Sequence, residues 1–86
     1  MPRPKWPTWW EWELELSPHL LKRMTERRIT EIDLRSMLDA ATSIRRDAEP
    51  GRWVIGTVHR RRAWSVILEP DPHARVVVVV TAFQVD

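Results

Sequence analysis

Tryptophan and leucine alternate with glutamate over residues 10–16, so the apolar side chains share one face of an extended chain and the acids share the other. This period-two pattern predicts a half-buried strand. Residues 1–8 contain three prolines, and we expect them to form a flexible arm in front of that strand.

The hydrophobic period changes after the first strand. Ser17 is a good helix N-cap, and Pro18 suits the first helical position, where its missing N–H costs nothing. A second helix is predicted to begin after Thr30, which forms a variant of the capping box with Asp33. The apolar residues with helical spacing, which would face a core, are Leu20, Leu21, Met24, Leu34, Met37, Leu38 and Ala41.

Period-two patterning returns in the second half of the chain and predicts four more strands, over residues 42–46, 52–60, 63–69 and 75–85. Arg61 and Arg62 fall at a reversal that lacks the Asn-Gly or Asp-Gly pair expected of a two-residue hairpin. The five valines of residues 76–80 favour burial on both faces and so indicate a central strand.

The predicted order of elements is β-α-α-β-β-β-β. It is typical of an α+β fold in which two helices pack on one face of a single antiparallel sheet. Because 86 residues support only one modest core, we expect residues 9–86 to form a single domain.

Composition limits the cellular compartments in which we expect the protein. The chain has no cysteine, which excludes a disulfide framework and a cysteine-based zinc site. Its longest purely apolar run, Val76–Val80, is too short to span a bilayer, and its N-terminus lacks the leucine-rich segment of a signal peptide. We therefore expect a cytoplasmic protein that does not associate with a membrane.

The formal charge of +2 is small, but it is unevenly distributed. Residues 1–43 carry seven basic and seven acidic side chains, whereas residues 44–62 carry six arginines and two acids. Twelve of the fourteen basic residues are arginine, the side chain best shaped for bidentate contact with phosphate. This distribution favours an anionic partner such as RNA.

Histidine and arginine are the remaining candidates for catalytic side chains. With only two glycines and three isolated histidines, the chain offers neither a phosphate-binding loop nor metal-ligand spacing, and we expect no cofactor or metal. His19, Arg23 and Arg27 recur every four residues and form one stripe on the first helix.

Cleavage of RNA without a metal needs an imidazole to move the proton of the 2′-OH and arginines to stabilise the phosphorane. DNA lacks the 2′-OH and would be bound without being cut. The residues expected to be catalytic are His19, Arg23, Arg27 and His59. Those expected to bind nucleic acid are Arg52, Arg60, Arg61 and Arg62. The alternative is that the stripe and the turn are solvated surface and that His59 is a packing histidine.

Four of the six tryptophans gather within residues 6–12. Trp6 and Trp9 either fold over an edge of the core or anchor a partner, because exposed indoles make good interface anchors. The second reading predicts a homodimer formed through the tryptophan-rich N-terminus.

One segment resembles a known family. It reads Ser17-Pro18-His19-Leu20-Leu21-Lys22-Arg23-Met24-Thr25-Glu26-Arg27-Arg28-Ile29. This is similar to the opening Ser-x-His-x-x-x-Arg-Met-x-x-Arg-Gly-Ile of small bacterial domains grouped with RelE/ParE-type toxins in the barnase–EndoU–colicin–RelE nuclease superfamily. The capped second helix, the Gly51-Arg52-Trp53-Val54 opening of a hairpin and the closing Val-Val-Thr strand extend the resemblance over residues 10–85.

The resemblance implies a RelE-like fold with two helices on a curved antiparallel sheet. It also implies a metal-independent endoribonuclease, the toxin held by a cognate antitoxin, with the family's helix residues at His19, Arg23 and Arg27 and its hairpin arginine at Arg52. Arg28 departs from the pattern, which has glycine there. A left-handed conformation would cost an arginine about 1 kcal/mol. The alternative function is a non-catalytic module of the same fold that binds nucleic acid or protein.

Overall fold

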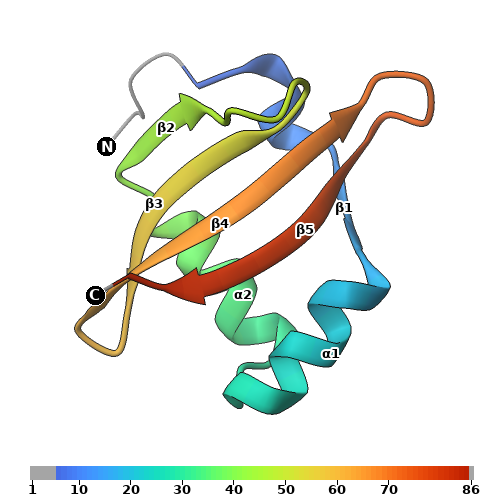
Figure 1. Ribbon diagram of the computed structural model, residues 1–86. Coiled ribbons are helices and arrows are strands. Elements are labelled where there is room, and N and C mark those ends of the chain that lie inside the picture. The colour runs from blue at the N-terminus through green and yellow to red at the C-terminus, as the bar shows by residue number, and fades with distance from the viewer. Residues whose placement is uncertain (1–5, 86) are drawn as a thin grey trace.

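Five strands form one sheet, and both helices lie across the same face of it (Figure 1). The computed structural model describes residues 6–85. In chain order its elements are the 3-10 helix η1 (Thr8–Glu11), β1 (Glu13–Leu16), α1 (Pro18–Arg27), α2 (Glu31–Asp39), β2 (Ser43–Arg46), β3 (Trp53–His59), β4 (Arg62–Asp71) and β5 (Val76–Gln84). The predicted α+β architecture with two helices is thereby confirmed.

The strand order is β1-β5-β4-β3-β2, and the last four strands pair antiparallel. β1 is different, because it lies parallel to β5, with Glu13 opposite Val76 and Leu16 opposite Val79. The prediction of a wholly antiparallel sheet is therefore wrong, and the sheet is mixed. Alternation along a strand reveals which face is buried but carries no information about the direction of the neighbouring strand.

The first strand is shorter than its pattern suggests. The alternation predicts it over residues 10–16, but it begins at Glu13, because the chain before it folds into η1. Two hydrogen bonds of 3.0 Å close this turn, from the N–H of Trp10 to the Pro7 carbonyl and from the N–H of Trp12 to the Trp9 carbonyl. The indoles still pack against the core, so their burial follows the pattern although their backbone is not extended.

Both helix starts are confirmed. The Ser17 hydroxyl accepts a hydrogen bond from the N–H of Leu20 at 3.0 Å. Thr30 and Asp33 form the reciprocal capping box, in which each side chain accepts from the backbone N–H of the other. α1 ends at Arg27 and is followed by the C-cap residue Arg28, whose φ of 56° is left-handed.

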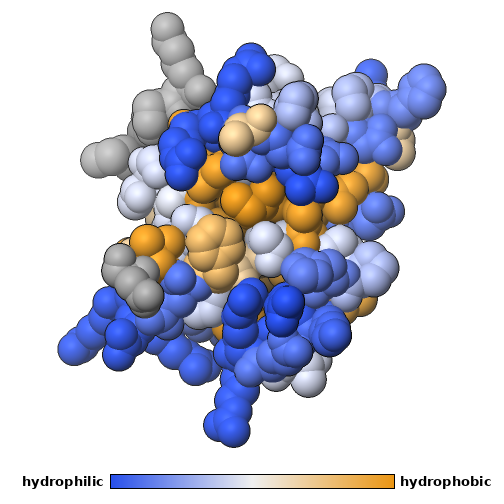
Figure 2. All heavy atoms as spheres, viewed as in Figure 1, coloured by the Kyte–Doolittle hydropathy of each residue, from blue (hydrophilic) through white to orange (hydrophobic). Residues whose placement is uncertain are grey.

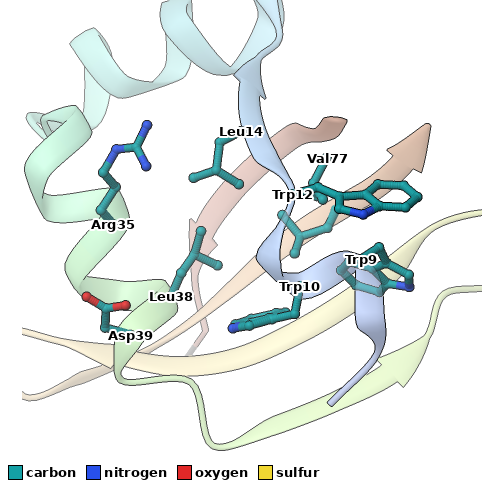
Figure 3. Close-up of a pocket in the computed structure, with 9 residues that line it drawn as sticks. Trp9, Trp10, Trp12, Leu14, Arg35, Leu38, Asp39 and Val77 are labelled. Carbon is teal, nitrogen blue, oxygen red and sulfur yellow. The ribbon is translucent and has the colours of Figure 1, made fainter. Parts of the chain in front are cut away.

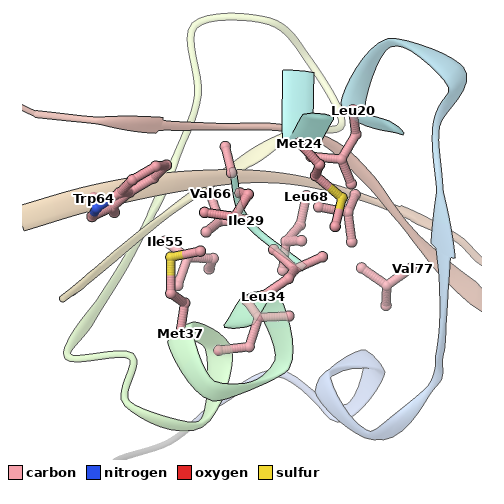
Figure 4. Close-up of a cluster of buried hydrophobic side chains, with 13 residues drawn as sticks. Leu20, Met24, Ile29, Leu34, Met37, Ile55, Trp64, Val66, Leu68 and Val77 are labelled. Carbon is pink, nitrogen blue, oxygen red and sulfur yellow. The ribbon is translucent and has the colours of Figure 1, made fainter. Parts of the chain in front are cut away.

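The hydrophobic core fills the space between the helices and the sheet (Figure 4). Its buried members are Leu20, Met24, Ile29, Leu34, Met37, Leu38, Ile55, Trp64, Val66, Leu68, Val77, Val79 and Ala82. Alternate valines of β5, among them Val76 and Val78, point to the opposite face and are only half-buried. β5 is an inner strand, but it is fully buried on one face only.

Neither helix in residues 6–85 has the length and apolar character needed to cross a lipid bilayer.

Thr57 is a buried polar residue that joins the sheet to a helix. Its side chain is 4% exposed, and its hydroxyl donates a hydrogen bond to the carbonyl of Met37 in the last turn of α2. The last carbonyls of a helix have no partner within the helix, so the hydroxyl satisfies a group that would otherwise be buried without a hydrogen bond.

We expect Thr57→Val, which keeps the shape of the side chain, to lower the free energy of unfolding by about 1–3 kcal/mol, because it leaves the buried Met37 carbonyl without a hydrogen-bond donor. Denaturant unfolding of the purified protein measures the change. Thr25→Val is the matched control, since the exposed Thr25 hydroxyl donates to the Leu21 carbonyl within α1 and its loss should cost about 0.5 kcal/mol or less. Equal losses at both positions would contradict the role given to Thr57.

Candidate nucleic-acid interface

A basic hollow of about 190 Å³ opens where the end of α1 meets the β3–β4 hairpin. We call it the hairpin pocket. Its lining side chains come from the end of α1, the hairpin, and the adjoining parts of β4 and β5: Arg27, Ile29, His59, Arg60, Arg62, Trp64 and Gln84. It brings together one imidazole and three guanidinium groups from segments more than thirty residues apart in the sequence.

Arg27 is held at this pocket by the edge of β5. β1 ends at Leu16, so the outer edge of β5 beyond Val79 has no neighbouring strand. The Ser17 hydroxyl donates to the Val80 carbonyl at 2.9 Å, and Arg27 Nη1 donates to the Ala82 carbonyl at 2.6 Å. Because a guanidinium has five N–H donors, Arg27 retains donors for a ligand in the pocket.

The hairpin turn is made of two arginines in an uncommon conformation. His59 pairs with Arg62, so the two-residue turn is Arg60–Arg61, one residue earlier than the Arg61–Arg62 reversal expected from the sequence. Both turn residues have positive φ, 51° and 66°, as a type I′ turn requires. Such conformations cost a non-glycine residue about 1–2 kcal/mol, and strain of this kind concentrates at functional sites.

His59 lies on the helix side of the sheet, where its ring meets Trp64 edge-on with 5.9 Å between the ring centres. Its Nε2 atom is buried and has no hydrogen-bond partner. Buried polar atoms without a partner are uncommon in folded proteins. His59 is thus a residue of the arginine-lined pocket that carries an unsatisfied polar atom.

An acidic side chain at the start of α2 offsets part of the positive charge of the hairpin pocket. The hydrogen bond from the Thr30 backbone N–H lowers the pKa of the Asp33 carboxyl, and the nearby positive charges of His59 and Arg60 lower it further. Asp33 thus stays ionised at neutral pH and places a negative charge near the basic pocket. Sequence reasoning placed Asp33 only in a helix cap, because its closeness to the hairpin depends on tertiary packing.

The structure does not bring the other predicted helix residues to the pocket. His19 is exposed at the second position of α1, about 12 Å from Arg27 along the helix axis. Arg23 donates to Glu26 at 2.7 Å, a contact that lowers the pKa of the Glu26 carboxyl. The expected stripe therefore contributes one residue, Arg27, to the pocket.

Of the four arginines predicted to bind nucleic acid, two line the hairpin pocket and two do not. Arg60 and Arg62 line the pocket, and Arg61 is exposed at the tip of the turn. Arg52 stands at the opposite end of β3, about 23 Å from His59 along the strand. There it donates to Glu69 at 2.9 Å, which raises the pKa of the arginine.

The N-terminal indoles pack against the body of the protein. Trp6 lies 4.7 Å from Trp10 between ring centres, and Trp9 lies 5.7 Å from Trp53. Both are half-buried, so the part of the expected arm within the described residues folds over the domain. Residues 1–5 of that arm lie outside the described residues.

A second hollow, of about 230 Å³, lies between α2 and the segment that carries η1 and β1 (Figure 3). Its walls include three tryptophans from residues 9–12, Leu14 and Leu38, and its charged members are Arg35 and Asp39. Arg35 donates to Glu31 at 3.0 Å. This hollow has no histidine, and its arginine is already paired with Glu31.

Three residues of the hairpin pocket, Ile29, Trp64 and Gln84, were not anticipated as site residues. Trp64 and Gln84 stand opposite each other on β4 and β5, and only the register of the sheet places them beside His59. Within the described residues, no group of three or more histidine, aspartate and glutamate side chains is arranged to hold a metal ion.

The fold and pocket define a small α+β domain with a basic site at one end of its sheet. Residues 16–86 match the model of DUF4258, a domain of unknown function. The match covers most of the chain, and the protein belongs to the DUF4258 family. No curated protein and no solved structure matches it significantly.

We expect Asp33→Asn to destabilise the protein in a pH-dependent way. The folded-state pKa of Asp33 lies below its ordinary value of 3.8, so its carboxylate stabilises the fold fully above that value and loses the effect as pH falls through the lowered pKa. The gap in melting temperature between the parent and the variant should be constant above about pH 5 and shrink below about pH 4. An unchanged gap at still lower pH would contradict this assignment.

Proposed function

We propose that the protein is a metal-independent endoribonuclease that holds a phosphodiester of RNA in the hairpin pocket. The observation that carries the proposal is that one pocket is lined by Arg27, Arg60, Arg62 and His59, a histidine whose buried Nε2 has no hydrogen-bond partner. A phosphodiester of RNA supplies negative charge for the guanidinium groups, and the 2′-OH beside it supplies a hydrogen-bond partner for the imidazole.

The proposed reaction uses the RNA's own 2′-OH. His59 takes the proton of the 2′-OH, whose oxygen attacks the adjacent phosphorus while the bond to the 5′-oxygen breaks. The imidazolium then returns the proton to that 5′-oxygen, leaving a 2′,3′-cyclic phosphate and a 5′-OH end. The arginines stabilise the charge that builds on the phosphoryl oxygens.

The resemblance to RelE/ParE-type toxins supports the same substrate class and adds a biological role. We propose that the protein is the toxin of a toxin–antitoxin pair, with a cognate antitoxin as its partner. The pocket contains one histidine rather than two, so the alternative in this proposal is a module that binds RNA through the same pocket without cutting it.

Cleavage tests the enzyme directly. In excess chelator, we expect the purified protein to cut RNA and His59→Ala to lower the rate by about 10²- to 10⁴-fold. His73→Ala, which changes an exposed histidine in the β4–β5 turn, is the matched control and should retain activity. His19→Ala tests the helix stripe separately from the pocket. If His19→Ala lost activity while His59→Ala kept full activity, the assignment of His59 as the catalytic residue would be overturned. If the protein bound RNA without cutting it, its function would be that of the RNA-binding module.

The strained turn gives a second test. Replacing Arg60 by Asn and Arg61 by Gly supplies the residues that a type I′ turn favours, and we expect it to raise the free energy of unfolding by about 1–2 kcal/mol. The same change should weaken RNA binding and lower its salt dependence by about one unit of log–log slope for each phosphate that the turn no longer neutralises.

Arg75→Gly provides the control for the turn. Arg75 also has positive φ, 55°, but lies in the β4–β5 turn away from the pocket. The substitution should stabilise the protein without changing its affinity for RNA. If the hairpin variant bound RNA as tightly as the parent, the turn arginines would have no part in recognition.

A further inference from the structure

Three indoles line the second hollow, the one between α2 and the segment that carries η1 and β1. We call it the tryptophan pocket. On an extended strand, Trp9 would point to the opposite face from Trp10 and Trp12. η1 takes the place of the strand at this point, and all three side chains line the pocket. Each indole is half-buried, so part of its surface is accessible to a ligand.

The lining of the tryptophan pocket is mostly apolar and offers few hydrogen-bond acceptors. Its other apolar side chains are Leu14, Leu38, Leu68 and Val77. Arg35 and Asp39 stand at its side on α2 (Figure 3). Indole and guanidinium groups only donate hydrogen bonds, so among the lining side chains Asp39 alone offers an acceptor. The hollow of about 230 Å³ is smaller than the roughly 300–1,000 Å³ of pockets for drug-sized ligands, which limits it to a small chemical group.

The elements around this pocket are strongly acidic. Residues 8–16, which hold η1 and β1, and residues 31–39 of α2 together carry six acidic side chains and one basic side chain. The basic one, Arg35, is paired with Glu31, with 3.0 Å between Nε and Oε2. Asp39 lies at the C-terminus of α2, where the helix dipole adds negative charge and the last turn has no basic residue. The potential at the pocket therefore favours a cation.

We propose that the tryptophan pocket binds a methylated ammonium group, such as the head of choline or the side chain of trimethyllysine. A cation of this kind is attracted to the face of an indole ring when it lies within about 6 Å of the ring centre. It has no N–H that needs an acceptor, whereas a primary ammonium group brings three. The indoles and leucines therefore suit its methyl groups, and the acidic surroundings supply the opposite charge.

The charge around the tryptophan pocket disfavours other occupants. An anion such as a phosphate of RNA would be repelled by the surplus of acidic side chains, and a neutral apolar group would gain nothing from them. The tryptophan pocket shares no lining residue with the hairpin pocket. The inference is therefore independent of the proposed cleavage of RNA.

Magnetic resonance spectra of the indole N–H groups, recorded while choline is added at constant ionic strength, test the proposal. We expect the signals of Trp9, Trp10 and Trp12 to shift together, with a dissociation constant in the millimolar range. Dimethylbutanol, the uncharged analogue of choline in which a carbon atom replaces the nitrogen, should bind about tenfold or more weakly. This comparison is needed because apolar side chains also gather on the side of the sheet away from the helices (Figure 2), and adhesion to them would not require the charge.

A second pair of probes identifies the source of the group. Trimethyllysine should bind and lysine should bind about tenfold or more weakly, because lysine loses more hydration and needs acceptors that the pocket lacks. The tighter binder of choline and trimethyllysine then shows whether the group belongs to a small molecule or to a modified protein.

Substitutions separate the contribution of charge from that of the aromatic surface. Asp39→Asn should weaken choline binding about three- to fivefold. Glu49→Gln, which changes an exposed acid between β2 and β3, is the matched control and should bind like the parent. Trp10→Leu should weaken binding about threefold or more, and Trp10→Phe, which restores an aromatic face, should recover part of the loss. Replacing Arg3 and Lys5 by alanine makes the chain more negative next to the pocket and should leave binding unchanged or tighter.

Three results would each overturn the proposal. They are equal binding of choline and dimethylbutanol, shifts confined to the signal of Trp64 in the hairpin pocket, and full binding in both Asp39→Asn and Trp10→Leu. Melting curves show whether each variant is folded. If Trp10→Leu did not fold, the exposed Asp39→Asn and its control would still decide the outcome.

Discussion

The outer edge of β5 sets the arrangement of the whole molecule. β5 has nine residues and its parallel neighbour β1 has four, so half of that edge would leave carbonyl groups without partners. Side chains at the two ends of α1 fill the gap, with Ser17 bonded to Val80 and Arg27 bonded to Ala82. The helix is thereby fixed along the strand, and Arg27 arrives beside the hairpin. Buried or half-buried backbone groups are almost always paired, and here the pairing also assembles the pocket.

Much of the fold follows from local patterns in the sequence. The two helix caps at Ser17 and Thr30 depend only on neighbouring residues, and both are present as expected. The alternation that indicated β3 and β4 also gave the correct inward faces for Ile55 and Val66. Local propensity and hydrophobic period determine such features, because they involve residues only a few positions apart.

Features that depend on contacts between distant segments were not predictable in this way. The parallel pairing of β1 with β5 joins residues more than sixty positions apart, and nothing in the alternation of β1 indicates its neighbour. The candidate site shows the same limit. Arg27 and His59 were both foreseen as candidates, but the sequence grouped Arg27 with His19, and the packing of α1 against β5 grouped it with the hairpin. Nothing in the local sequence around Trp64 or Gln84 indicates that these residues line a pocket.

The pairing of β1 with β5 also has a consequence for how the domain folds during synthesis. Helices and hairpins form from contacts close in sequence, whereas this pair closes a loop of nearly the whole domain. On the ribosome, the first strand has no partner until β5 has emerged. The sheet is therefore completed only when its last strand has left the exit tunnel.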